Sequence, residues 1–171
     1  SLSDLERALP DALGQARRVR PQGMRTPPDR LVAFYEGPMG RATVLASPMP
    51  PGGAPADAVV VDAVRGALAQ DLQEGTRALA QPYWTGEPDF QTLAIDDGPV
   101  LACGTLERRA GQRAPMANQG RLLNQRCFTV IGDKLVGMLL TVPFREDASG
   151  PLGRQRDFIA ALARLLAAAP R

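Results

Sequence analysis

The sequence contains no histidine, and its only two cysteines are Cys103 and Cys127. The missing histidine removes the side chain that proteins use most often as a general base, as a pH switch and as a metal ligand. The two cysteines lack the CxxC spacing of a redox pair, and alone they are too few to hold a structural zinc ion. The composition therefore argues against the commonest metal and nucleophilic sites.

Lysine and long apolar runs are also scarce. Lys134 is the only lysine among 20 basic residues, and a net charge of +2 is too small to dictate an anionic partner. Abundant arginine, alanine and proline are typical of a GC-rich bacterial genome; the alternative is selection for bidentate contacts with phosphate or carboxylate. No apolar run approaches the roughly 20 residues that span a bilayer. We predict no nucleic-acid partner and no transmembrane segment.

The length of 171 residues predicts one globular domain over 1–171. Apolar residues make up 44% of the chain and charged residues 22%, which argues against disorder throughout. The chain begins at Ser1 without methionine, and we therefore expect a signal segment upstream of it.

Periodicity and turn residues divide the chain into a mixed order of helices and strands. Ser3 and Glu6 are a capping box for a short N-terminal helix, Gly75 is a C-cap for the central helix, and Ser149 can cap the last helix. The other predicted elements are a strand near 15–20, a hairpin at 30–47, a helix at 55–74, an edge strand at 82–84, strands at 90–95 and 100–108, a loop at 109–120, a hairpin at 122–142 and a helix at 150–169.

Cys103 and Cys127 fall in two of these strands, which we interpret as antiparallel neighbours. The two-residue turn Gly132-Asp133 places Cys127 opposite Met138, and Cys103 can lie opposite Cys127. Opposed residues have Cβ atoms roughly 4.5–5.5 Å apart, near the separation in a disulfide. We predict a structural disulfide, which indicates an exported protein; the alternative is two buried, reduced cysteines.

In this register both faces of the sheet are apolar, so helices should cover both. The predicted fold class is α+β, an antiparallel β-sheet with helices on both faces, or α/β/α sandwich. The order of elements, with the apolar hairpin Cys127–Val142 running into a helix that carries Phe158, Ile159 and Leu162, resembles the PsbP-like fold. This superfamily includes bacterial periplasmic DcrB-like proteins. The resemblance matches no residue motif; it implies a non-enzymatic accessory or binding module in an export compartment.

Few residues suggest catalysis. The serines have neither a G-x-S-x-G context nor a histidine to activate them. Glu87, Asp89 and Glu107 are candidates for a carboxylate-dependent hydrolase, which needs at least two acids that converge in one cleft. Solvated loop acids are the alternative for Glu87 and Asp89. We predict no enzyme, no metal site and no cofactor.

The candidate partner surface has two parts. The basic segment 15–25, QARRVRPQGMR, could contact a polyanion, or it could be a solvated strand. Trp84 is the only tryptophan, and it serves either as a core anchor or as an exposed binding residue beside the loop 48–55. The candidate residues are Tyr83, Trp84, Met49, Arg17, Arg18 and Arg20.

The leading hypothesis is a non-catalytic, periplasmic or otherwise exported module that binds another envelope protein or component. One alternative is a hydrolase that uses the acids named above. The other is a cytosolic interaction domain that uses the arginine-rich strand.

Overall fold

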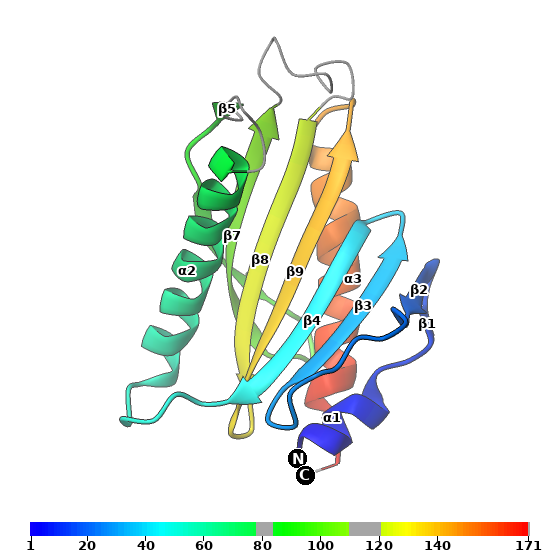
Figure 1. Ribbon diagram of the computed structural model, residues 1–171, viewed down its shortest axis with the longest axis vertical. Helices are drawn as coiled ribbons and strands as arrows, with labels where there is room; N and C mark the ends of the chain where they lie inside the picture. The colour runs from blue at the N-terminus through cyan, green and yellow to red at the C-terminus, as the bar shows by residue number, and fades with distance from the viewer. Residues whose placement is uncertain (78–83, 110–120, 171) are drawn as a thin grey trace.

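The computed structural model describes residues 1–77, 84–109 and 121–170 (Figure 1). The helices are α1 (Leu2–Ala8), α2 (Ala56–Arg77) and α3 (Ser149–Ala167). The strands are β1 (Ala12–Leu13), β2 (Ala16–Val19), β3 (Leu31–Gly37), β4 (Gly40–Pro48), β5 (Trp84–Thr85), β6 (Asp89–Ala94), β7 (Val100–Arg109), β8 (Arg121–Ile131) and β9 (Lys134–Phe144). Residues 110–120 of the predicted loop at 109–120 and most of the predicted edge strand at 82–84 lie outside the described residues. Arg109 belongs to β7 and not to a loop.

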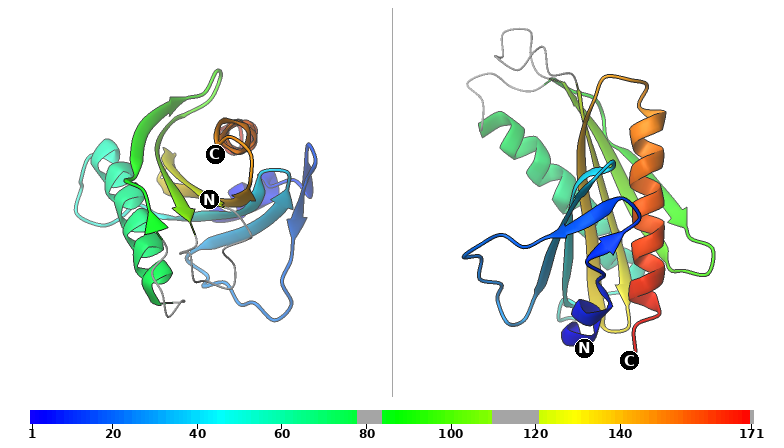
Figure 2. Two further views of the ribbon diagram at one scale, coloured as in Figure 1. Left: turned by 90° about the horizontal axis from the view of Figure 1, so that it is seen from above. Right: turned by 90° about the vertical axis from the view of Figure 1, so that its right-hand side faces the viewer.

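All strands belong to one antiparallel sheet with the order β1-β2-β3-β4-β9-β8-β7-β5, and β6 also pairs with β7. Helix α3 lies on one face of the sheet and α2 on the other (Figure 2). The predicted α+β fold, with helices on both faces, is therefore confirmed. No helix in the described part of the chain is long and apolar enough to cross a membrane.

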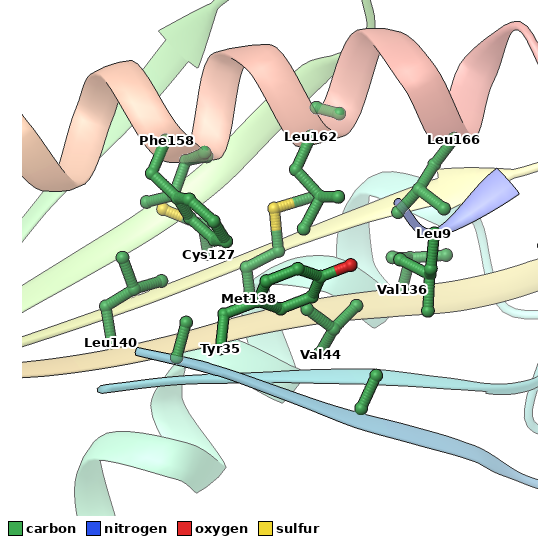
Figure 3. Packing of buried hydrophobic residues seen from close by; sticks show 14 of the residues in the cluster. Leu9, Tyr35, Val44, Cys127, Val136, Met138, Leu140, Phe158, Leu162 and Leu166 are labelled. Carbon is green, nitrogen blue, oxygen red and sulfur yellow. The ribbon is translucent and has the colours of Figure 1, made fainter. Parts of the chain in front are cut away.

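The larger core lies between the sheet and α3 (Figure 3). Phe158 and Leu162 of α3 pack there over Met138 and the ring of Tyr35, and the Tyr35 and Phe158 ring centroids are 5.5 Å apart. The Tyr35 hydroxyl donates a hydrogen bond to the carbonyl oxygen of Pro10 at 2.7 Å. Burial raises the pKa of Tyr35 above its usual value. Thus a single side chain joins the α3 core to the N-terminal segment.

The smaller core lies under α2, where Val64 and Leu68 pack against Leu106 and Phe128. A glycine in β7 permits this close approach. A Cβ atom at Gly104 would lie 2.5 Å from Leu68 Cδ1 and 2.8 Å from Val64 Cγ1. The helix therefore packs almost onto the backbone of β7.

The predicted cysteine register is confirmed. Ile131 pairs with Lys134, Cys127 with Met138, and Cys103 with Cys127. The two cysteines form a disulfide, with their Cα atoms 4.1 Å apart. The bond links β7 to β8 in the α3 core.

The predicted N-terminal capping box was wrong by two residues. Ser1 is the N-cap, its hydroxyl accepts a hydrogen bond from the Asp4 backbone N–H, and the Asp4 side chain completes the box. Ser3 and Glu6 lie inside the helix instead. Both pairs have the serine-to-acid spacing of a capping box, so the pattern alone does not distinguish them.

The predicted ends of the two longer helices were also displaced. Helix α2 continues through Gly75 to Arg77. Ser149 is the first residue of α3; Ala148 is the N-cap and makes no side-chain capping bond. Asp147 fills that role in part, because its Oδ1 accepts a hydrogen bond from the Ser149 N–H at 2.9 Å, which lowers the Asp147 pKa.

Candidate functional site

The two helices do not cover the sheet equally. Helix α2 packs against β7 and β8, and in the described part of the chain no helix lies over β2, β3 and β4 on that side (Figure 1). The loop over 20–30 borders this region, and all of its residues are exposed. Half of the sheet therefore has a helix on one face only.

Opposed residues of antiparallel strands share a face, so the register defines what lies on the uncovered half. One row across the sheet runs Phe128, Gly137, Leu45, Val32. The next runs Arg126, Leu139, Thr43, Phe34, Val19. The third is polar and runs Asn124, Thr141, Arg41, Glu36, Arg17. The apolar cluster under α2 thus continues across the sheet beyond the helix.

We call the side chains of Val19, Val32, Phe34, Thr43 and Leu45 the open face. All five are half-buried, although they belong to a sheet whose opposite face is core. Side chains of this kind on a sheet that lacks its second layer form a surface that another molecule can cover.

Charged residues lie along one side of the open face. Arg17, Glu36 and Arg41 are exposed. The Nε atom of Arg41 lies 3.3 Å from Oε1 of Glu36. The two arginines exceed the single glutamate in this row, so the border is weakly cationic.

A hollow of about 320 Å³ lies where α2 meets the open face. Its polar lining comes from Arg41, Thr43, Gln70, Asp71, Arg126 and Thr141. A partner that covered the open face would therefore also meet polar groups at this end.

The hollow contains a buried ion pair between β8 and α2. Nε of Arg126 donates to Oδ2 of Asp71 at 2.7 Å, and Nη2 donates to Oδ1 at 2.9 Å. Nη1 donates to the Leu140 carbonyl oxygen at 2.6 Å. The Thr141 hydroxyl, which accepts from Nη2 at 3.3 Å, also bonds Asn124 Oδ1 at 3.0 Å. This bidentate pair fixes α2 on the sheet and so fixes where the open face begins.

The predicted arginines Arg17 and Arg18 of β2, and Arg20 directly after it, have different environments. Arg17 lies at the border of the open face and is exposed. Arg18 points the other way, where its Nη1 donates to the Leu9 carbonyl oxygen at 3.5 Å, and its guanidinium pairs with Glu6 at 3.6 Å. Arg20 pairs with Asp11 at 2.8 Å. Of these three arginines, only Arg17 lies at the border of the open face.

The other predicted surface residues lie elsewhere. Met49 follows β4 and is half-buried, and its N–H donates to the Asp133 carbonyl oxygen at 3.2 Å. Trp84 begins β5 at the opposite end of the sheet from β2, where its backbone pairs with Arg109. Tyr83 lies outside the described residues. The structure therefore does not join Trp84 and the arginines into one surface.

The candidate acids also differ in their surroundings. Glu87 and Asp89 are exposed. Glu107 is half-buried and pairs with Arg121 at 3.3 Å. Since Asp89 pairs with Thr105, it shares a sheet face with Glu107, two residues further along β7. Glu107 is thus paired with a cation.

Sequence reasoning missed the Arg126–Asp71 pair and the open face. One pattern could have revealed the pair: Asp71 continues the apolar stripe of Val60, Val64 and Leu68, where a charged residue requires a buried partner. No comparable pattern identifies the open face, because it depends on which strands α2 covers.

No family model and no curated protein matches this sequence. Among solved structures, the fold is similar to the Ran-binding protein Mog1p of Saccharomyces cerevisiae, with 10% identity over 90% of this chain and 87% of that chain and a TM-score of 0.44. It is also similar to cyanobacterial PsbP from Synechocystis sp. PCC 6803, with 10% identity over 88% of this chain and 92% of that chain and a TM-score of 0.46. A PsbP structure is thus among the similar structures, as the order of elements predicts. At these identities the likeness concerns the fold alone.

Proposed function

We propose that this protein is a non-catalytic binding or accessory module that acts in the periplasm or another exported compartment. It contacts a second protein or envelope component through the open face. The single observation that carries this proposal is the half-covered sheet, on which an apolar core row continues beyond α2 into partial exposure.

The chemistry of the open face favours a protein partner. Its centre is aliphatic and aromatic, with Phe34 between Val19 and Thr43, and its border carries Arg17 and Arg41. An apolar centre with a polar rim is the usual composition of a protein interface, in which aromatic and arginine side chains contribute most. The matching surface would be apolar with acidic residues at its border.

The disulfide supports the exported location. Cytosolic thiols are kept reduced, whereas disulfides persist in the periplasm and other oxidising compartments. Cys103 and Cys127 lie in the core with no catalytic groups arranged around them in the described residues, which fits a structural staple.

Photo-cross-linking in the native cell tests the binding role. A benzophenone amino acid replaces Phe34 in one variant and, as a matched control, the exposed Leu165 of α3 in another. We expect a discrete cross-linked species from position 34 and none of the same mass from position 165. A further variant combines the benzophenone at position 34 with Leu45→Glu, which places a charge on the open face. This variant should not form the cross-linked species of position 34.

Thermal unfolding of each variant shows whether it is folded. A folded position-34 variant without a cross-linked species, or one with the same species as position 165, would contradict the proposal.

A further inference from the structure

The sheet has a second unusual feature at its other end, in β6. This six-residue strand pairs with β7 on one side. In the part of the chain that the structure describes, no strand pairs with its outer side. Proteins usually protect such an edge with lysine, proline or a bulge inside the strand. The sequence of β6, DFQTLA, contains neither lysine nor proline.

Exposed apolar side chains gather along this edge. Of the six large apolar side chains that are exposed in the described residues, Phe90 and Val100 belong to β6 and its partner β7, and two others, Val61 and Leu72, belong to α2. Phe90 is 52% exposed and Val100 is 61% exposed, and both belong to strands that pair with each other. Their exposure is high for side chains of this kind on a sheet.

Helix α2 packs on β7, the strand that pairs with β6. Phe90 pairs with Gly104, the residue on which Leu68 and Val64 of α2 pack. Val61 lies seven residues before Leu68 and Leu72 four residues after it, so both lie on the same flank of the helix as Leu68. The exposed side chains of α2 therefore lie on the helix flank that contains Leu68, which packs on the residue paired with Phe90.

Acidic residues stand at both ends of the strand. Glu87 and Asp89 are at its start, and Asp96 and Asp97 follow its end; all four are exposed. Arg164 of α3 donates from Nε to the backbone oxygen of Asp96 at 2.8 Å, and both aspartate side chains are nevertheless exposed. The edge is therefore apolar in its middle and negative at its two ends.

We propose that β6 is a docking edge for an extended segment of a partner protein that has alternating apolar residues and basic residues at both ends. The segment would add one strand to the sheet. Its backbone would bond the free edge of β6, and its side chains on one face would cover Phe90 and the flank of α2. The basic ends would meet the two acidic pairs.

The same charges disfavour a second copy of this chain. An antiparallel pairing of two β6 strands sets Asp89 of one copy near Asp96 and Asp97 of the other, and a parallel pairing sets Asp89 near Asp89. Like charges directly opposite each other destabilise a sheet. This edge is separate from the open face because α2 lies between them, so the proposal does not depend on the function assigned to that face.

A synthetic peptide tests the proposal with the full chain. The probe is a fluorescein-labelled peptide of five alternating valines and threonines with two lysines at each end. The control peptide has the same five central residues with two glutamates at each end. We expect the lysine peptide to bind at low ionic strength about tenfold more tightly than the glutamate peptide. This difference should shrink as salt is added. In NMR spectra recorded with and without the lysine peptide, the backbone amide chemical shifts of β6 should change most.

Three variants locate the binding. Phe90→Ser should lower the affinity for the lysine peptide about tenfold. Thr92→Lys, which places a charge on the exposed side of the edge, should weaken it as well. Leu165→Ser, which removes an exposed apolar side chain from α3, should leave the affinity unchanged. Unfolding curves show which variants are folded. If Phe90→Ser does not fold, Thr92→Lys provides the test.

Several results would overturn the proposal. The lysine peptide could fail to bind at millimolar concentration, or both peptides could bind with equal affinity. Leu165→Ser could also weaken binding of the lysine peptide as much as Phe90→Ser does. A dimer in sedimentation that Phe90→Ser dissociates would show that a second copy covers the edge, and would also overturn it.

Discussion

Removal of Asp71 should destabilise the protein far more than removal of an exposed acid. In the Asp71→Ala variant, the guanidinium of Arg126 would keep its bond to the Leu140 carbonyl oxygen but lose both bonds to the carboxylate. The side chains of Arg126 and Asp71 are only 9% and 11% exposed. Most of the surface of both charged side chains is therefore shielded from solvent.

The expected cost follows from this burial. Breaking a buried pair by removing one partner costs about 3–5 kcal/mol, because an uncompensated charge stays inside. For a chain of 171 residues, each kcal/mol lowers Tm by roughly 2–4 °C, so we expect a decrease of at least about 6 °C. A loss of this size is a large fraction of the roughly 5–15 kcal/mol that stabilises a domain.

Urea and thermal unfolding measure the loss, and two variants serve as controls. Glu36→Ala breaks the exposed pair with Arg41 and should cost less than about 1 kcal/mol. The double variant Asp71→Leu, Arg126→Met removes both charges and should recover much of the loss. If Asp71→Ala costs no more than Glu36→Ala, the pair does not hold α2 on the sheet.

Three further changes test the core. Cys103→Ala with Cys127→Ala opens a loop with a sequence separation of 24. In the chain-entropy treatment this should cost about 3.5 kcal/mol in urea unfolding, and a loss below about 1 kcal/mol would contradict the staple. Burial raises the pKa of Tyr35, so stability should fall as pH rises above about 10, where the unfolded chain loses the phenol proton first. Tyr35→Phe should remove this alkaline decrease in Tm. An unchanged decrease in that variant would refute its assignment to Tyr35. Gly104→Ala would place a Cβ atom 2.5 Å from Leu68 Cδ1, and it should cost about 1–3 kcal/mol in thermal unfolding. No loss would show that α2 can move away.

The disulfide and the two-sided sheet could be predicted because both depend on local rules. The Gly132-Asp133 turn fixes the pairing of β8 with β9, and the period of two along a strand then assigns every side chain to a face. Opposed cysteines and two apolar faces follow directly from that register. The alternation in β2 was also predictable, with Arg17 and Val19 on one side and Arg18 on the other.

The open face could not be predicted because it depends on long-range pairing. Strand β4 lies beside β9, about ninety residues later in the chain, and this choice places the first hairpin beyond the reach of α2. The burial of Arg18 likewise depends on how α1 packs, through Leu9 and Glu6. The Arg126–Asp71 pair joins residues 55 positions apart. Local periodicity indicates which residues are apolar but not which element covers them.

The proposed exported module requires that the disulfide between Cys103 and Cys127 exists in the native cell. Protein from that cell is denatured and alkylated with and without prior reduction, and its intact mass is measured. We predict that Cys103 and Cys127 take up the alkylating reagent only after reduction. Immediate labelling of both thiols would contradict the disulfide in the cell and the exported location together.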